Sequence, residues 1–221
     1  EQILEVGLPV RANLTPEEFA HLGAQARAHF GNNIQALALA WTLPYAVECN
    51  SITGALALGF DAGRRIMVAL AERENLPTDR VTEGLALLGV AMADAFIGCW
   101  AAKFEFNLLR PITYIRRVID QKWEPLLITP PFPEYPSGHS TQSGAAAAVL
   151  TAVFGENFAF EDATHARDGL APRHYAGFAA AAQEAALSRL YGGIHFRAAV
   201  ERGLDQGRCI GAFANALRMR K

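Results

Sequence analysis

The chain has no excess of charge of either sign, which argues against one broad class of function. Its 221 residues contain 20 Lys and Arg against 22 Asp and Glu. A protein that holds nucleic acid on a broad basic surface needs a marked excess of positive charge, so we expect no nucleic-acid partner. The hydrophobic share of 51% is enough for a full core and does not suggest disorder.

Cysteines are few, and long apolar runs are scarce. Cys49, Cys99 and Cys209 have no metal-like spacing, and their odd number argues against a complete disulfide framework. We expect each to be a small apolar core residue. The longest apolar run, over 84–102, contains Asp94 near its middle. It could span a bilayer by length, but a central carboxylate favours a buried core helix, so we expect no transmembrane segment.

The compartment is left open by the sequence. No signal peptide is visible, but the chain begins with Glu1 and not with methionine. Localisation therefore stays unknown. We expect a soluble protein, for which secretion or the periplasm would fit.

Alternating strand patterns are also scarce, whereas helix signals recur along the chain. Thr15-Pro16-Glu17-Glu18 is typical of a helix start, and Pro111 should end or kink the long helix that opens after Pro77. The expected fold class is all-α, with a single helical domain over residues 1–221. We expect helices over 15–29, 34–43, 51–58, 62–73, 79–109, 112–119, 139–154, 175–191 and 197–217, and an irregular stretch over 158–172.

One helix start carries residues suited to binding an oxyanion. Residues 133–140 read Pro-Glu-Tyr-Pro-Ser-Gly-His-Ser, and an alanine-rich run follows over 145–150. The first backbone N–H groups of a helix have no intrahelical partner, and the helix dipole there favours negative charge. A small hydroxyl residue, a glycine and His139 therefore lie where an oxyanion can be held.

Two further segments could supply cations to such an anion. Lys103 and Arg110 are seven residues apart on one expected helix, so both should project from nearly the same face. An isolated pair of this kind is usually a solvated basic edge, but the neighbouring residues are apolar or aromatic, and buried cations need an anionic partner. Arg189, with its planar fork, precedes Gly192-Gly193 and His195. Taken alone, His195 is an ordinary core or surface histidine.

Together these residues resemble an ordered three-part signature, K-x6-RP, then PSGH, then SR-x5-H. Vanadium-dependent haloperoxidases and type 2 phosphatidic acid phosphatases share it. All three parts match in order and without substitution between Lys103 and His195. A triplet in this order is far more specific than any one part. The resemblance implies an all-α bundle with an anion site in the segment 94–196. Many haloperoxidases carry an additional helical half, so this chain is short for that family.

The resemblance also implies a vanadate cofactor, whose site phosphate could occupy as well. His195 would be the axial ligand to the vanadium of vanadate, and His139 the acid–base group on the opposite side. Lys103 would also polarise the oxidant, so Lys103, His139 and His195 are the expected catalytic residues. The equatorial oxygens of the anion would be bound by five groups: Lys103, Arg110, Ser137, the backbone N–H of Gly138 and Arg189.

The residues around the three motifs are similar to the haloperoxidase versions. Trp100 and Phe132 match aromatic positions that line the halide side of chloroperoxidase-like members, although ordinary core packing would explain them equally well. The implied reaction is oxidation of a halide by hydrogen peroxide to hypohalous acid. Hydrogen peroxide and halide are therefore the expected partners, and the resemblance allows a small organic acceptor and a homodimer.

Two alternative functions stay open. In a soluble acid phosphatase, His195 would attack phosphorus to form a phosphohistidine, and His139 would protonate the leaving oxygen. A non-catalytic anion-binding helical domain is the third hypothesis, but such a domain needs neither histidine. Asp94 lies nine residues before Lys103. It could pair with an arginine of the site from behind, or be a helix-interior aspartate hydrogen-bonded elsewhere.

Overall fold

The computed structural model describes residues 52–164, 166 and 171–217, with side chains from Gly63 onward. The helices expected over 15–29 and 34–43 lie outside these residues. The all-α class is confirmed for the described part, apart from one small ribbon. The elements are α4 (Ile52–Arg73), α5 (Thr78–Phe106), α6 (Pro111–Val118), α7 (Gly138–Phe154), β1 (Phe160–Asp162), β2 (Arg173–Tyr175), α8 (Phe178–Tyr191) and α9 (Arg197–Asn215).

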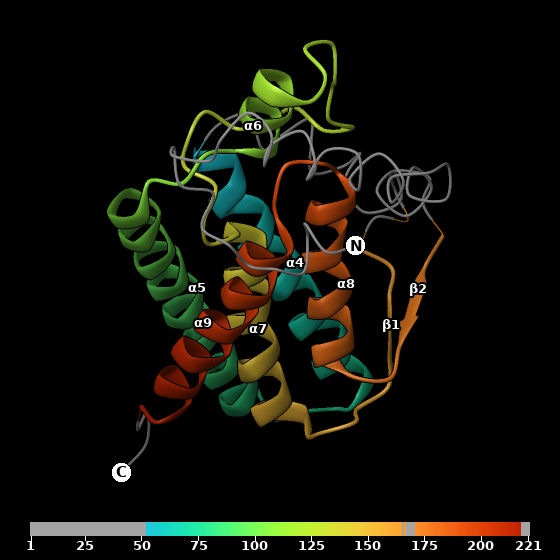
Figure 1. Ribbon diagram of the computed structural model, residues 1–221. Coiled ribbons are helices and arrows are strands. Elements are labelled where there is room, and N and C mark those ends of the chain that lie inside the picture. The colour runs from blue at the N-terminus through green and yellow to red at the C-terminus, as the bar shows by residue number, and fades with distance from the viewer. Residues whose placement is uncertain (1–51, 165, 167–170, 218–221) are drawn as a thin grey trace.

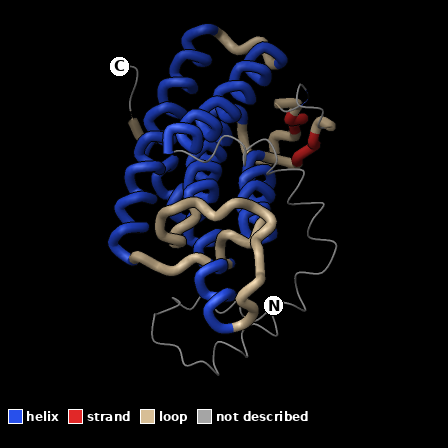
Figure 2. The backbone as a smooth tube through the Cα atoms, turned by 90° about the horizontal axis from the view of Figure 1, so that it is seen from above, coloured by secondary structure: helices blue, strands red, loops and turns tan. Residues whose placement is uncertain are grey.

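Helix α7 is the central element of the bundle. It contacts α9, α5, α8 and α4 (Figure 1). Short α6 and the loops beside it lie at one end of the bundle, and Figure 2 views the molecule from that end. The proline-rich loop between α6 and α7 therefore leads directly into the start of the central helix.

Small residues let α9 approach α7 closely. Gly203, Gly207 and Gly211 recur every four residues along α9, so they share one face. A Cβ atom at Gly203 would lie 2.7 Å from the carbonyl oxygen of Ser137, the residue that caps α7. Because glycine has no Cβ, the two backbones can touch. This contact fixes the position of the α7 N-terminus.

The apolar core lies around the inner face of α7. Leu88, Val149, Leu190 and Val200 come from α5, α7, α8 and α9, and each is almost fully buried. Burial of such side chains stabilises a protein by about 1.5–3 kcal/mol each. Phe178 at the start of α8 stacks on Phe160 of β1, which attaches the ribbon to the same core.

Several sequence expectations were wrong in detail. The helices expected over 51–58 and 62–73 are one continuous helix, α4. The stretch expected to be irregular, 158–172, contains strand β1, and strand β2 follows directly after it, so α8 begins at Phe178 and not at 175. Phe160 pairs with Tyr175, and both rings reach the core. Cys99 is buried as expected, but Cys209 is exposed.

The end of α5 differs most from the expectation. The helix ends at Phe106, and Asn107 adopts a left-handed conformation with φ 46°. Arg110 is extended and precedes Pro111, which occupies the first turn of α6, where its missing N–H costs nothing. Lys103 and Arg110 therefore do not lie on one helix face. They meet because the chain turns between the two helices.

Helix α5 is not buried on all sides. The stretch Thr78–Val118 is the one described segment that is long and apolar enough to cross a membrane, and 33% of its apolar window is buried. Core helices of globular proteins pass the same test, so this observation alone is weak evidence. Ile97 and Phe104 are 65% and 64% exposed, whereas Leu88, Ala91 and Ala95 lie in the core, so the expected core helix is buried on only part of its surface.

Candidate anion-binding site

The N-terminus of α7 is built as the sequence predicts. Ser137 is fully buried and caps the helix, because its Oγ accepts a hydrogen bond from the backbone N–H of Ser140 at 3.3 Å. Its own hydroxyl proton is not needed for this cap and can be donated elsewhere. Gly138 is the first helical residue, and a Cβ there would lie 3.1 Å from the Trp100 ring. Glycine thus allows Trp100 to pack against the helix start.

Lys103 fixes the loop that leads into this helix. Its side chain is completely buried, and Nζ donates to the carbonyl oxygens of Pro133, Glu134 and Pro136 at 3.0, 3.0 and 2.5 Å. An ammonium group has three protons, so these bonds use all of them. In this arrangement Lys103 has no further donor. Burial lowers its pKa to about 7, and a bound anion would raise it again, so Lys103 contributes positive charge when the site holds an anion.

Arg110 connects the proline loop with the segment before α9. Its Nε donates to the carbonyl of Phe132 at 2.9 Å, and its Nη1 donates to the carbonyl of Ile194 at 2.8 Å. The same Nη1 lies 3.1 Å from Nε2 of His195. Its Nη2 is buried and has no hydrogen-bond partner among the described residues. A buried guanidinium nitrogen without an acceptor is costly, so Nη2 is a donor suited to an anion.

His195 is held from behind by a buried carboxylate. Its Nδ1 lies 2.8 Å from Oε1 of Glu134, and the same oxygen accepts the backbone N–H of Phe196 at 2.9 Å. Because a carboxylate accepts, Nδ1 carries the proton, and the Nε2 lone pair faces Arg110. Gly193, between α8 and His195, has φ 74°, a conformation that favours glycine, and this turn of the chain brings His195 to Glu134. His195 is thus fixed in the tautomer that can bind a metal or attack an electrophile.

Burial and neighbouring cations keep both histidines neutral. The pKa of His139 is lowered well below its ordinary value by burial and by the charges of Arg189, Lys103 and Arg110. Burial and the same three cations also lower the pKa of His195. Burial lowers the pKa of Arg110 to about 10, so it stays a cation at neutral pH. An anion among these cations would offset their effect on the histidines.

Arg189 and the two aromatic residues complete the surroundings. Arg189 is 3% exposed at the end of α8, and it is the cation with the largest effect on His139. The Phe132 ring lies 5.3 Å from Nζ of Lys103 and 5.0 Å from Cζ of Arg110, which is cation–π range. Trp100 packs against Phe132 with ring centroids 5.2 Å apart. The two rings therefore form an aromatic wall beside the cations.

Asp94 is not part of this site. It lies on the exposed side of α5, and no ion pair among the described residues involves it. The expectation of an inward partner for an arginine is wrong, because Asp94 lies about half a turn away from the inward-facing Lys103. Glu134, which sequence reasoning missed, is the carboxylate that the structure brings to the site. No local pattern marks Glu134, because its partner His195 lies 61 residues further along the chain.

The charges of the pocket favour an anion with several oxygens. Lys103, Arg110 and Arg189 are all at least 95% buried, and Glu134 is the one buried carboxylate among the described residues. Burial raises the pKa of Glu134, which weakens its ability to balance three cations. A tetrahedral oxyanion could accept from Ser137, the α7 N-terminus and Nη2 of Arg110, beside His195. The residues present therefore fit vanadate or phosphate.

The fold and this pocket define a helical domain with two histidines beside buried cations. The chain belongs to the vanadium haloperoxidase family, because the model of the VCPO second helical-bundle domain matches residues 83–122 and 117–221. The vanadium chloroperoxidase of Curvularia inaequalis is 34% identical over 102 residues, which cover 37% of this chain and 17% of that protein.

Two solved structures extend the comparison to the fold. The crystal structure of a bacterial vanadium-dependent iodoperoxidase superposes with a TM-score of 0.74 and 41% identity, over 92% of this chain and 48% of that one. The structure of an apo-type bacterial vanadium-dependent chloroperoxidase gives a TM-score of 0.59 and 18% identity, over 93% of this chain and 52% of that one, and so supports the fold alone. The chain spans about half the length of these structures.

Proposed function

We propose that this domain is a vanadate-dependent haloperoxidase that oxidises halide with hydrogen peroxide to hypohalous acid. The observation that carries the proposal is the setting of His195. Its proton is held by Glu134, and its Nε2 lies 3.1 Å from a buried arginine whose Nη2 has no partner among the described residues. A neutral nitrogen ligand beside uncompensated cations is the environment that a bound oxyanion with a metal centre requires.

When bound, vanadate supplies a Lewis acid that activates hydrogen peroxide towards a halide. Vanadate would be held by Arg110, Arg189, Ser137, the N–H of Gly138 and His195. Lys103 would act differently from the role first expected for it, because its three protons are donated to loop carbonyls. Its contribution would be positive charge and a rigid loop, while the arginines supply the direct bonds.

His139 is the residue we assign to proton transfer. The overall reaction, H2O2 + X⁻ + H⁺ → HOX + H2O, consumes one proton for each halide oxidised. His139 follows Gly138 at the start of α7, and its pKa is lowered by burial and by Arg189. The negative charge of a bound anion would reverse part of that effect and let His139 take up and deliver a proton near neutral pH.

The aromatic wall would provide the halide side of the pocket. Trp100 Nε1 is buried without a partner among the described residues, and Phe132 packs against it. An N–H donor beside apolar rings suits a large, weakly hydrated anion such as iodide or bromide. The iodoperoxidase relative at 41% identity makes iodide the first halide to test.

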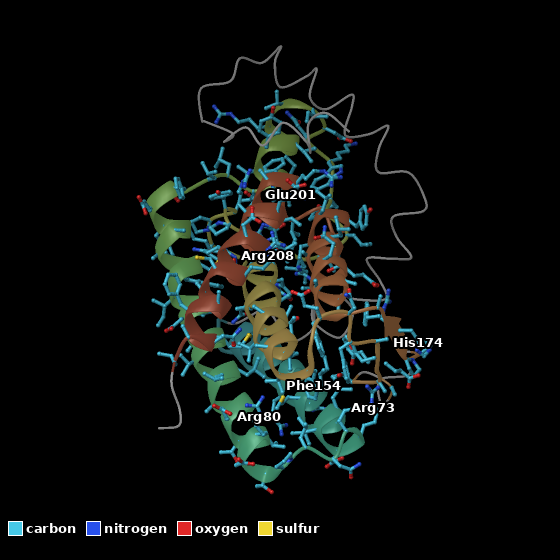
Figure 3. The ribbon with its side chains drawn as sticks, turned by 90° about the horizontal axis from the view of Figure 1, so that it is seen from below. Arg73, Arg80, Phe154, His174, Glu201 and Arg208 are labelled. Carbon is cyan, nitrogen blue, oxygen red and sulfur yellow. The ribbon has the colours of Figure 1, made fainter. Side chains whose placement is uncertain are left out.

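The experiment compares iodide oxidation with and without vanadate. Purified protein is titrated with vanadate, and triiodide formation from hydrogen peroxide and iodide is measured at each concentration. We expect saturable activation that is lost in His195→Ala. The matched control is His174→Ala, because His174 is exposed on β2 at the outer edge of the molecule (Figure 3). Folded protein without vanadate-dependent oxidation of iodide or bromide would refute the proposal.

A soluble acid phosphatase is the second candidate, and the same histidine geometry supports it. A His195 ring with Nδ1–H bound to Glu134 presents a nucleophilic Nε2, as a phosphohistidine mechanism needs. Hydrolysis of p-nitrophenyl phosphate, measured in parallel, separates the two functions. Turnover that His195→Ala abolishes and vanadate inhibits would favour the phosphatase. Vanadate binding without either activity would instead indicate an anion-binding domain.

A further inference from the structure

A separate apolar cavity adjoins the anion site. It has a volume of about 100 Å³ and lies between α7 and α8, with walls from α4, α5 and β1. His139 and Arg189 line one end of it, whereas Lys103, Arg110 and His195 do not contribute to its lining. The cavity therefore meets the anion site on the His139 side. The mechanism proposed above does not use it.

Small side chains create this space. Helix α8 contributes Ala181, Ala182 and Ala185 to the lining, and α7 contributes Ala146 and Ala147. Two facing alanine surfaces leave room that leucine or valine at the same positions would fill, because native interiors are otherwise close-packed. Phe160 and Phe178 line the cavity as well. The walls between α7 and α8 are thus mainly apolar, and the polar residues Ser143, Ser188 and Asp162 also contribute to the lining.

One polar residue of the lining, Gln142, has a buried hydrogen-bond donor that a ligand could use. Gln142 lies three residues after His139, so both side chains project from the same face of α7. Gln142 is 6% exposed, and its Nε2 has no hydrogen-bond partner among the described residues. A buried amide N–H without an acceptor is costly. A ligand oxygen at this end of the cavity would satisfy it.

The size of the cavity limits the ligand. An apolar protein cavity of about 150 Å³ holds a benzene molecule. A cavity of about 100 Å³ that opens to one side can therefore take a single ring only if part of the ring reaches into the opening. Asp162 of β1 also lines the cavity, so a ligand with a negatively charged group at that end would be disfavoured.

We propose that this cavity binds a small single-ring organic molecule with one oxygen acceptor, of the class of simple phenols. The apolar ring would lie between α7 and α8, and its oxygen would accept the N–H of Gln142 near His139. As an acceptor of halogen, this molecule rests on the proposed haloperoxidase function. Transfer from hypohalous acid breaks the O–X bond, forms a ring C–X bond and releases the displaced ring proton with hydroxide as water.

Binding can be tested without any turnover. The probe is 4-fluorophenol, and its dissociation constant is measured by fluorine NMR on the full chain without vanadate or peroxide. Ala185→Leu places a larger side chain in the cavity, one turn before Arg189, and should weaken binding at least fivefold. The matched control is Ala180→Leu on the exposed side of α8, which should bind like the unmodified chain. Equal affinity in both variants would overturn the proposal, as would no saturable binding to the unmodified chain.

A second pair of measurements covers the case in which Ala185→Leu fails to fold. Ala146→Leu fills the cavity from the α7 side and should weaken binding to a similar extent. Gln142→Leu should weaken 4-fluorophenol binding but leave fluorobenzene binding unchanged, because only the phenol has an oxygen for the amide. Loss of both ligands, or of neither, would refute the assigned role of Gln142. Because no measurement here uses vanadate, failure of iodide oxidation would leave the binding result standing, and the reverse also holds.

Discussion

The two sides of His139 are built from the same helices but by different physical means. On one side, Lys103 and Arg110 donate to loop carbonyls, and Glu134 holds His195. On the other, alanine is the commonest residue of the lining, beside larger apolar side chains such as Leu150 and Phe178. The charged side therefore fixes the orientation of a ligand through hydrogen bonds, whereas the apolar side selects a ligand by its volume. One histidine at the start of α7 faces both.

The two sides differ because different kinds of segment supply their polar backbone groups. On the charged side, the carbonyls that accept bonds from Lys103 and Arg110 come from segments that lack regular structure, namely the proline loop and the turn after α8. The apolar side lies between helices whose backbone groups are already satisfied. Polar recognition is consequently confined to the loop end of the bundle, where Figure 2 shows the loops crossing the helix ends.

The largest expected effect comes from removing a cation on the charged side. Arg110→Met deletes both the Nη2 donor and the contact with His195, so vanadate-dependent iodide oxidation should fall about 10²–10³-fold, the scale for loss of one oxyanion donor. Binding of 4-fluorophenol should not change, because Arg110 does not line the cavity. Steady-state kinetics and fluorine NMR measure the two quantities.

Arg116→Met is the control for this change, since Arg116 lies on α6 and pairs with exposed Glu124. It should leave both quantities as they are. If Arg110→Met weakened phenol binding as strongly as iodide oxidation, with its melting temperature preserved, the division into two sides would be wrong.

A smaller effect is expected from Glu134, which acts on the site through His195. Glu134→Gln keeps an oxygen that can accept the His195 Nδ1–H but removes the charge, and should lower vanadate affinity about tenfold. Glu134→Ala removes both and should cost about a hundredfold. Vanadate titration gives the dissociation constants. Glu105→Gln, at an exposed position on α5, is the control, and equal affinity in all three variants would remove Glu134 from the site.

The smallest effect concerns stability and pH. The folded-state pKa of His139 lies below its ordinary value, so below about pH 6.5 the unfolded chain binds a proton that the folded chain does not. Stability that His139 contributes at neutral pH is therefore lost as the pH falls from about 6.5, by about 1.4 kcal/mol per pH unit.

Urea unfolding at pH 7, 6 and 5 tests this expectation. His139→Asn should lose less stability between pH 6 and pH 5 than the unmodified chain, by about 1 kcal/mol. Comparison of the two proteins removes the contributions of other groups, including Glu134. Saturating phosphate should flatten the slope of the unmodified chain, because an anion offsets the cations that keep His139 neutral. Parallel slopes in both proteins would contradict the assigned environment of His139.

The fold was largely predictable because the helix signals are local. Ser137 as a cap, the glycines at 192 and 193, and the apolar run after Ser140 each determine an element within a few residues, and α7 and α9 appear close to their expected ranges. The predicted helix ends were wrong where a capping residue stopped a helix before its hydrophobic periodicity ended. Asn107 ended α5 in a left-handed conformation three residues before the expected end.

The site was less predictable, because it depends on contacts between distant residues. Lys103 and Arg110 were expected to meet through helix spacing, and they meet through a turn instead. Glu134 had no role in the sequence reasoning, since only the fold brings it within 2.8 Å of His195, 61 residues later. Asp94 was expected to pair with an arginine of the site but is exposed, because its direction depends on which face of α5 packs inward.

By itself, the sequence determined the helical class, the position of the α7 N-terminus and the family to which the chain belongs, because local capping, periodicity and motif order are written in adjacent residues. Only the tertiary structure decided where the protons of Lys103 go, which carboxylate holds His195, and that an alanine-lined cavity lies beside His139. These features are set by burial and by the packing of α7 against α8 and α9. Burial and packing depend on the whole chain at once.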